Sequence, residues 1–123
     1  MKYTAFISYS QADVRLAKLI HRSLENYQIP KRYLGRRPET ESWKTSLAPV
    51  FRDIDELDSS IDLTDEIRAN LDASHFLILV CSPDAAQSPW VDLEVAHFAS
   101  SHDLSKLIFV SDESILSSHA IST

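Results

Sequence analysis

The sequence predicts one doubly wound α/β domain, in which helices cover both faces of a mostly parallel sheet. Short apolar runs alternate with stretches of helical periodicity, and this alternation implies parallel strands joined by right-handed crossovers. The run HFLILVC at 75–81 is almost unbroken in apolar residues, as expected of a central strand covered on both faces. The chain has 123 residues, 44% of them hydrophobic, which suffices for a single core-forming domain.

The chain begins with a predicted strand and a predicted helix. Residues 3–9 form a short apolar and aromatic run bounded by Ser10, which is typical of a strand. Residues 13–27 repeat apolar side chains at the spacing of one helix face. Ile29 and Pro30 end this helix, because the residue before a proline is biased away from helical geometry. The predicted apolar stripe consists of Leu16, Ile20, Leu24 and Tyr27.

A long polar connection leads to a second strand at the edge of the predicted sheet. Residues 31–46 show no clear period and are interpreted as this connection. Residues 47–51 form a brief strand, and Pro49 marks it as an edge strand because proline cannot donate to the ladder. The next segment, RDIDELDSS at 52–60, is interpreted as an acidic loop.

The second half of the chain continues the alternation. Asp62 or Thr64 caps a helix, and the central strand at 75–81 follows it. Another helix starts at Ser88, and residues 107–110 form a fourth strand. The inward positions of the two helices are expected to be Leu63, Ile67, Leu71, Val91, Val95 and Phe98. The whole chain is therefore interpreted as a single domain, 1–123.

The tail at 111–123 is serine-rich and weakly periodic. A sheet of this kind normally continues with another strand and helix. We therefore expect these last elements to be irregular or truncated.

Composition and charge argue against several functional classes. The net charge of −6 argues against a nucleic-acid-binding protein. No apolar run approaches the ~20 residues of a membrane span, and residues 1–4 lack the character of a signal peptide. The single Cys81 cannot form an internal disulfide, which favours a cytoplasmic location. Gly35 is the only glycine, so glycine-rich phosphate-binding loops are excluded.

The segment SPWVDLE at 88–94 is the strongest candidate for chemistry. Ser88 is a good N-cap, and Pro89 suits the first helical position. Trp90 and Glu94 lie four residues apart, so they project from the same side of the helix. The helix starts beyond the carboxyl end of the central strand, where open α/β sheets bind ligands. An aromatic ring beside a carboxylate favours binding of a sugar-like cationic centre, and ordinary packing is the alternative.

A phosphate-receiver domain shares this architecture, but this chain lacks the acidic residues that such a domain needs. Such domains need paired acids after the first strand and an aspartate after the third. This chain has SYS at 8–10 and CSP at 81–83 instead.

Three segments resemble the motifs of Toll/interleukin-1 receptor (TIR) domains. The segment FISYS at 6–10 resembles the first conserved box, and VFRDIDEL at 50–57 resembles the second box with its loop. The segment LVCSP at 79–83, followed by SPWVDLE at 88–94, is similar to the third strand and its helix. The order agrees over most of the chain, and three boxes in order are a specific signal. The resemblance implies a flavodoxin-like sheet.

A further segment, YQIPKR at 27–32, resembles the bacterial branch of the family. In that branch the TIR domain often heads a longer protein, so further domains are expected.

The resemblance implies an enzyme that cleaves the bond between nicotinamide and ribose in NAD+. The essential acid of such enzymes is the glutamate of a W-x-x-x-E-like motif, which matches Glu94. The loop after the second strand, at 53–62, closes over the nucleotide in this family. The substrate-binding residues are accordingly expected to be Tyr9, Ser10, Asp53, Ser82 and Trp90.

A single carboxylate suffices for this chemistry. Ordinary glycosidases need a second acid to protonate the departing oxygen. Nicotinamide in NAD+ is already a cationic leaving group, so Glu94 has only to stabilise positive charge on the ribose and hold its hydroxyls. Trp90 or Tyr9 is expected to stack on the flat rings, gaining roughly 0.5–2 kcal/mol. NAD+ is thus expected as substrate, without a cofactor, and no metal is expected because the five histidines lack metal-ligand spacing.

Self-association is expected to control activity, because in this family a neighbour's loop helps to complete the site. The expected partners are other TIR domains, in a homo-oligomer or filament of a bacterial defence or signalling effector. The alternative is a non-catalytic TIR scaffold that acts by homotypic interaction, since the fold supports both roles. A nucleoside deoxyribosyltransferase-like enzyme matches the boxes at 8–10 and 52–53 less well. Linear and cyclic ADP-ribose both remain open as products.

Overall fold

A computed structural model describes residues 2–30, 46–52 and 62–111, and a parallel sheet forms the centre of this part. Its four strands follow the order β2-β1-β3-β4, and every pairing is parallel. The strands are β1 (Tyr3–Ser8), β2 (Val50–Arg52), β3 (Ser74–Val80) and β4 (Leu107–Val110). The predicted doubly wound fold is confirmed. The apolar strand β3 lies inside the sheet, and β2 lies at an edge of the described sheet, as predicted.

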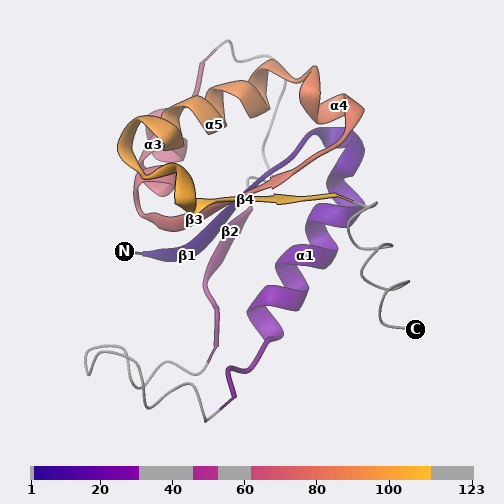
Figure 1. The fold of residues 1–123 in the computed structure, drawn as a ribbon, viewed down its shortest axis with the longest axis vertical. Coiled ribbons are helices and arrows are strands. Elements are labelled where there is room, and N and C mark those ends of the chain that lie inside the picture. Colours follow the sequence, from indigo (N-terminus) through magenta and orange to yellow (C-terminus); the bar gives the residue numbers. More distant parts are fainter. Residues whose placement is uncertain (1, 31–45, 53–61, 112–123) are drawn as a thin grey trace.

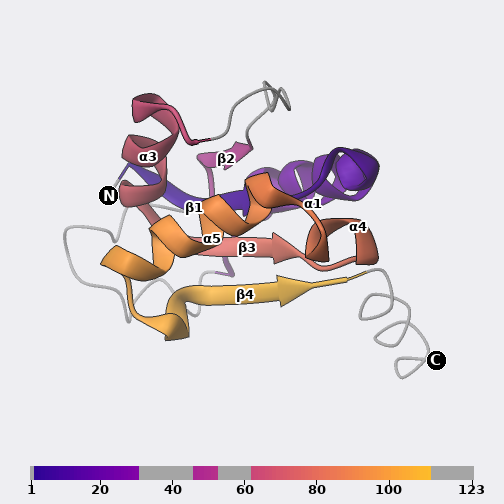
Figure 2. The ribbon, with the colours of Figure 1, turned by 90° about the horizontal axis from the view of Figure 1, so that it is seen from above.

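Helices cover both faces of the sheet (Figure 1). Helix α1 (Val14–Asn26) lies on one face, and α3 (Asp65–Asp72) and α5 (Pro89–Ser101) lie on the other. Seen from above, α5 runs across the sheet in front of β1 and β3 (Figure 2). Three short helices complete the described part: the 3-10 helices η1 (Gln11–Asp13) and η3 (Leu104–Lys106) and the α-helix α4 (Pro83–Ala86). None of the helices in the described ranges is long and apolar enough to span a bilayer.

The pleat of β1 divides the apolar side chains into two cores. Successive residues of a strand point to opposite faces, so Ile7 packs towards α1 and Phe6 packs towards α3 and α5. The first core contains the buried residues Ala5, Ile7, Tyr9, Ala17, Val50, Ile78 and Val80. The second contains Phe6, Leu63, Ile67, Leu71, Leu77, Trp90 and Phe98. Of the predicted inward positions, Val91 is also buried, whereas Val95 is half-buried.

The predicted stripe of the first helix is wrong at its last position. Tyr27 is 49% exposed, because it takes extended backbone after α1 ends at Asn26. The following residue, Gln28, forms an antiparallel bridge with Ser46, which draws the chain away from the helix axis. The fully buried residue of this helix is Ala17.

The second strand was predicted at 47–51, but it is shorter and runs one residue further, to Arg52. The strand begins at Val50, after the cis peptide bond between Ala48 and Pro49. Thr64, rather than Asp62, caps helix α3, since its hydroxyl accepts the backbone N–H of Ile67 at 3.2 Å. Residues 31–45 of the predicted connection, 53–60 of the predicted acidic loop and 112–123 of the predicted tail lie outside the described residues.

The N-cap of α5 gives a test of the local structure that presents Glu94. The hydroxyl of Ser88 accepts the backbone N–H of Val91 at 3.2 Å. Ser88→Ala removes this acceptor, so we expect the free energy of unfolding to fall by about 1 kcal/mol in urea titrations. Ser88→Asp restores a good capping group and should recover the loss. Equal stability of the wild type and Ser88→Ala would contradict the assignment of Ser88 as an energetically significant cap.

Candidate functional site

Glu94 is the only charged side chain that is buried in the described part of the chain. It lies one turn inside α5, on the face turned towards the sheet, with 1% of its surface exposed. Its Oε1 accepts a hydrogen bond of 2.7 Å from the hydroxyl of Ser8, at the carboxyl end of β1. A carboxylate is costly to bury without such a donor. Helix α5 therefore presents a carboxyl oxygen to the carboxyl edge of the sheet.

Trp90 lies one turn before Glu94 and is also buried, as the shared helix face predicts. Its ring belongs to the core between the sheet and α3, which includes Phe6 and Ile67. Its indole Nε1 is buried and has no hydrogen-bond partner among the described residues. The ring is thus a core side chain, one helical turn from the glutamate.

A second polar group lies on the opposite face of the sheet. The hydroxyl of Tyr9 accepts a hydrogen bond from Nη1 of Arg52 at 3.2 Å, and Nε of Arg52 donates to Nδ1 of His21 at 3.4 Å. Glu25 lies 3.4 Å from the other ring nitrogen of His21 and accepts the backbone N–H of Val50 at 2.8 Å. This network connects α1 to the end of β2. Tyr9 and Glu94 therefore lie at the same end of β1 but on opposite faces.

A third group connects the carboxyl ends of β1 and β3. Ser10 donates to Oδ2 of Asp13 at 3.0 Å, and Ser82 donates to the same oxygen. Ser82 also caps α4, since its hydroxyl accepts the backbone N–H of Ala85 at 3.0 Å. The strand order reverses direction between β1 and β3, and ligands of such sheets bind at this crevice. Two predicted residues, Ser10 and Ser82, thus meet at the expected place.

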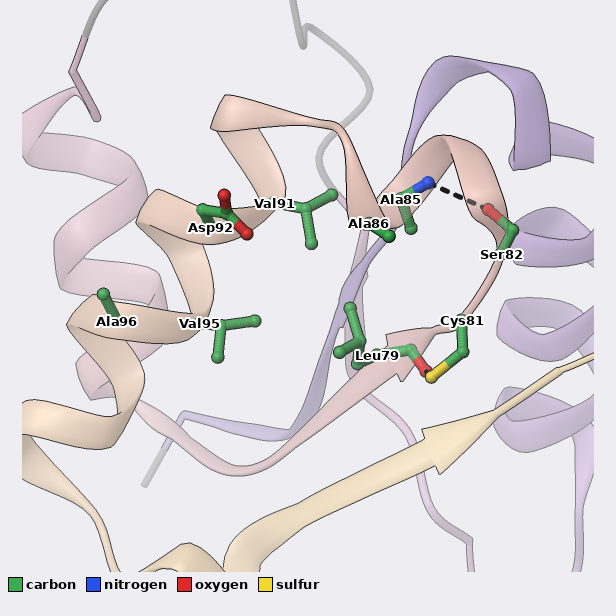
Figure 3. A pocket seen from close by; sticks show the side chains of 9 residues that line it. All are labelled: Leu79, Cys81, Ser82, Ala85, Ala86, Val91, Asp92, Val95 and Ala96. Carbon is green, nitrogen blue, oxygen red and sulfur yellow. Dashed lines mark hydrogen bonds between the residues drawn. The ribbon is translucent and has the colours of Figure 1, made fainter.

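An open cavity of about 470 Å³ lies beside this edge, between β3, α4 and α5 (Figure 3). Its walls are mainly apolar, and Asp92 supplies a charged group. The lining residues are Leu79, Cys81, Ser82, Ala85, Ala86, Val91, Asp92, Val95 and Ala96. Of the predicted site residues in the described ranges, Ser82 alone is among them. Glu94 points from another face of α5, so this cavity is distinct from the surroundings of the glutamate.

Comparison with known proteins decides the family. The family model for the TIR domain matches residues 5–119, which is most of the chain. The chain belongs to the TIR domain family. This result confirms the resemblance carried by the three boxes, and the parallel sheet confirms the flavodoxin-like fold.

This TIR domain is similar to a curated protein, the NAD(+) hydrolase ApTIR of an Actinoplanes species. The two are 41% identical over 110 residues, which cover 88% of this chain and 14% of the relative. The chain therefore spans about one seventh of the length of that relative.

A solved structure has a similar fold. The TIR domains of the activated Roq1 resistosome, which directly recognises the pathogen effector XopQ, match with a TM-score of 0.55 and 21% identity. The match covers 89% of this chain and 55% of that chain. At this identity the likeness supports the fold alone.

The predicted site residues of the TIR domain fall into three groups. Glu94 and Trp90 share the α5 side of the sheet, Ser10 and Ser82 meet through Asp13, and Tyr9 lies on the α1 side. Asp53 lies outside the described residues. No group of three or more metal-ligating side chains occurs within the described ranges.

Sequence reasoning did not select two residues that contact the predicted site. Ser8 lies in the first box and bonds to Glu94, and Asp13 follows that box and joins the two serines. The strand pleat provides a signal for Ser8, because Ser8 and Tyr9 must face opposite sides. His97, one turn after Glu94 on α5, has its Nε2 3.0 Å from the carboxylate of Asp72.

Proposed function

We propose that this TIR domain hydrolyses NAD+ at the bond between nicotinamide and ribose, with Glu94 as the catalytic carboxylate. The observation that carries the proposal is the burial of this carboxylate at the carboxyl end of the sheet, where Ser8 holds it. The relation to an NAD(+) hydrolase supports the choice of substrate. No cofactor is needed, since NAD+ itself is the substrate.

The proposed reaction needs only one acid group from the protein. The bond between the ribose carbon and the nicotinamide nitrogen breaks, and its electron pair leaves with nicotinamide, which departs neutral. The positive charge that develops on the ribose is stabilised by Glu94, whose effect is strong where water is excluded. Water then attacks the ribose carbon and loses a proton, giving ADP-ribose. Trp90, Tyr9, Ser10, Asp53 and Ser82 are proposed to contact the dinucleotide.

Burial of Glu94 has a consequence for regulation. A carboxylate that is 1% exposed reaches a ribose only after the groups around it rearrange. This supports a resting domain of low activity that assembly with other TIR domains, in a homo-oligomer or filament, switches on. Such control suits a cytoplasmic effector of bacterial defence or signalling.

Activity that depends on assembly is directly measurable. We expect nicotinamide release per mole of protein to rise with protein concentration and to rise further on a crowding surface. NAD+ and its products should be separated by chromatography, which also distinguishes linear from cyclic ADP-ribose. Specific activity that stays constant over a wide range of protein concentration would contradict control by assembly.

A non-catalytic scaffold is the competing proposal. The same burial of Glu94 favours it, because a buried carboxylate also serves to fix the position of α5. Absence of turnover under every assembly condition would select the scaffold and overturn the proposed hydrolase.

A further inference from the structure

The hydrogen bond between Ser8 and Glu94 joins two elements that are remote in sequence. Ser8 ends β1, whereas Glu94 lies 86 residues later on α5. Both side chains are buried, and the oxygens are 2.7 Å apart, a distance at the upper end of the range for a hydroxyl bound to a carboxylate. Because both side chains are buried, the bond lies in a region of low dielectric, where a hydrogen bond is stronger than in water.

The donor is fixed more rigidly than an ordinary surface serine. Ser8 is paired with Leu79 of β3, so its backbone lies in the interior of the sheet. The pleat turns Ser8 towards α5, while Tyr9 turns towards α1. A serine side chain has a single rotatable bond to its oxygen, so the sheet determines where the hydroxyl lies.

The acceptor needs such a restraint. The terminal torsion of a glutamate is broad, and the three torsions of the side chain leave the carboxylate many orientations. A hydrogen bond to Oε1 selects one orientation and keeps the carboxylate close to the end of β1. Stabilising charge on a bound ribose requires the carboxylate to be in place before the bond breaks, because reorganisation during the reaction costs rate.

We propose that Ser8 is a positioning residue for the reaction, which it serves by orienting the Glu94 carboxylate. This inference rests on the proposed hydrolase function. A displacement of about 1 Å at a reacting group can reduce turnover roughly 100-fold. Loss of the Ser8 hydroxyl should therefore lower kcat by about 10- to 100-fold and leave KM nearly unchanged, since Ser8 acts through Glu94.

Ser74 provides a matched control for this test. It is a buried serine in the neighbouring strand β3, and its hydroxyl donates to the carbonyl of Asn70 at 2.7 Å. Ser74→Ala thus removes one buried hydrogen bond from the same sheet without touching Glu94. We expect Ser8→Ala and Ser74→Ala to lower Tm by similar amounts, while only Ser8→Ala lowers kcat. Ser8→Thr keeps a hydroxyl and should recover part of the turnover.

The experiment measures kcat, KM and Tm for the wild type and the three variants at the protein concentration that gives full wild-type activity. Equal kcat for Ser8→Ala and Ser74→Ala would overturn the positioning role and leave the hydrolase intact. A folded Ser8→Thr variant no more active than Ser8→Ala would also overturn it. A wild type without turnover overturns the proposed function, and the positioning role falls with it.

Discussion

Glu94→Gln is expected to lower nicotinamide release by at least about 100-fold, the typical cost of removing one electrostatic contact to a charged transition state. The amide has nearly the same size and still accepts a hydrogen bond from Ser8, so the fold should survive. Thermal stability should stay equal or rise, because a buried charge is replaced by a neutral group. The measurement is steady-state release of nicotinamide beside a thermal denaturation scan.

Glu66→Gln is the matched control for this variant. Glu66 is an exposed glutamate of α3, on the same side of the sheet as α5. The substitution is chemically identical, so it should leave turnover within about twofold of the wild type, as surface changes away from a site usually do. If Glu94→Gln retained the turnover of Glu66→Gln, another group would have to carry the chemistry. Glu94 would then be a structural carboxylate.

Local patterns suffice to predict most of the described sheet. The predicted fourth strand coincides with β4 at Leu107–Val110, and the predicted central strand at 75–81 differs from β3 by one residue at each end. These strands are apolar runs bounded by polar or turn-forming residues, so the local sequence is enough to predict where they begin and end. Their parallel order follows from the helices that separate them.

The arrangement of the site residues is harder to predict from the sequence, because it depends on strand pleat and on contacts between distant segments. Tyr9 and Glu94 were expected to line one pocket, yet the pleat of β1 turns Tyr9 towards α1 and Ser8 towards Glu94. The alternation itself is readable from sequence, but which face receives α5 is not. Asp13 likewise gains its role only when η1 brings it to Ser82, 69 residues away. The short helix α4 was missed because a single turn has no period to detect.

Phe98→Ala is expected to reduce the free energy of unfolding by about 3–5 kcal/mol, a large share of the 5–15 kcal/mol typical of a domain. Phe98 is fully buried under α5, and its ring stacks on His102 with centroids 3.8 Å apart. His102 in turn contacts the carbonyl of Ser74 at 2.9 Å, which connects the end of α5 to β3. The variant leaves a cavity in the core. It also removes the ring on which His102 stacks, which weakens the connection between α5 and β3. Urea titration monitored by circular dichroism measures the loss.

Phe109→Ala is the control, because it removes the same ring from an exposed place. Phe109 lies on β4 and is 63% exposed, so its truncation should change stability by less than about 1 kcal/mol. Similar losses for the two phenylalanines would contradict the view that the core beneath α5 holds the helix. If Phe98→Ala loses more free energy of unfolding than Phe109→Ala, packing against that core holds α5 in its position on the sheet. Because Glu94 lies one turn before Phe98 on the same face, that core then also sets how closely the carboxylate approaches the end of β1.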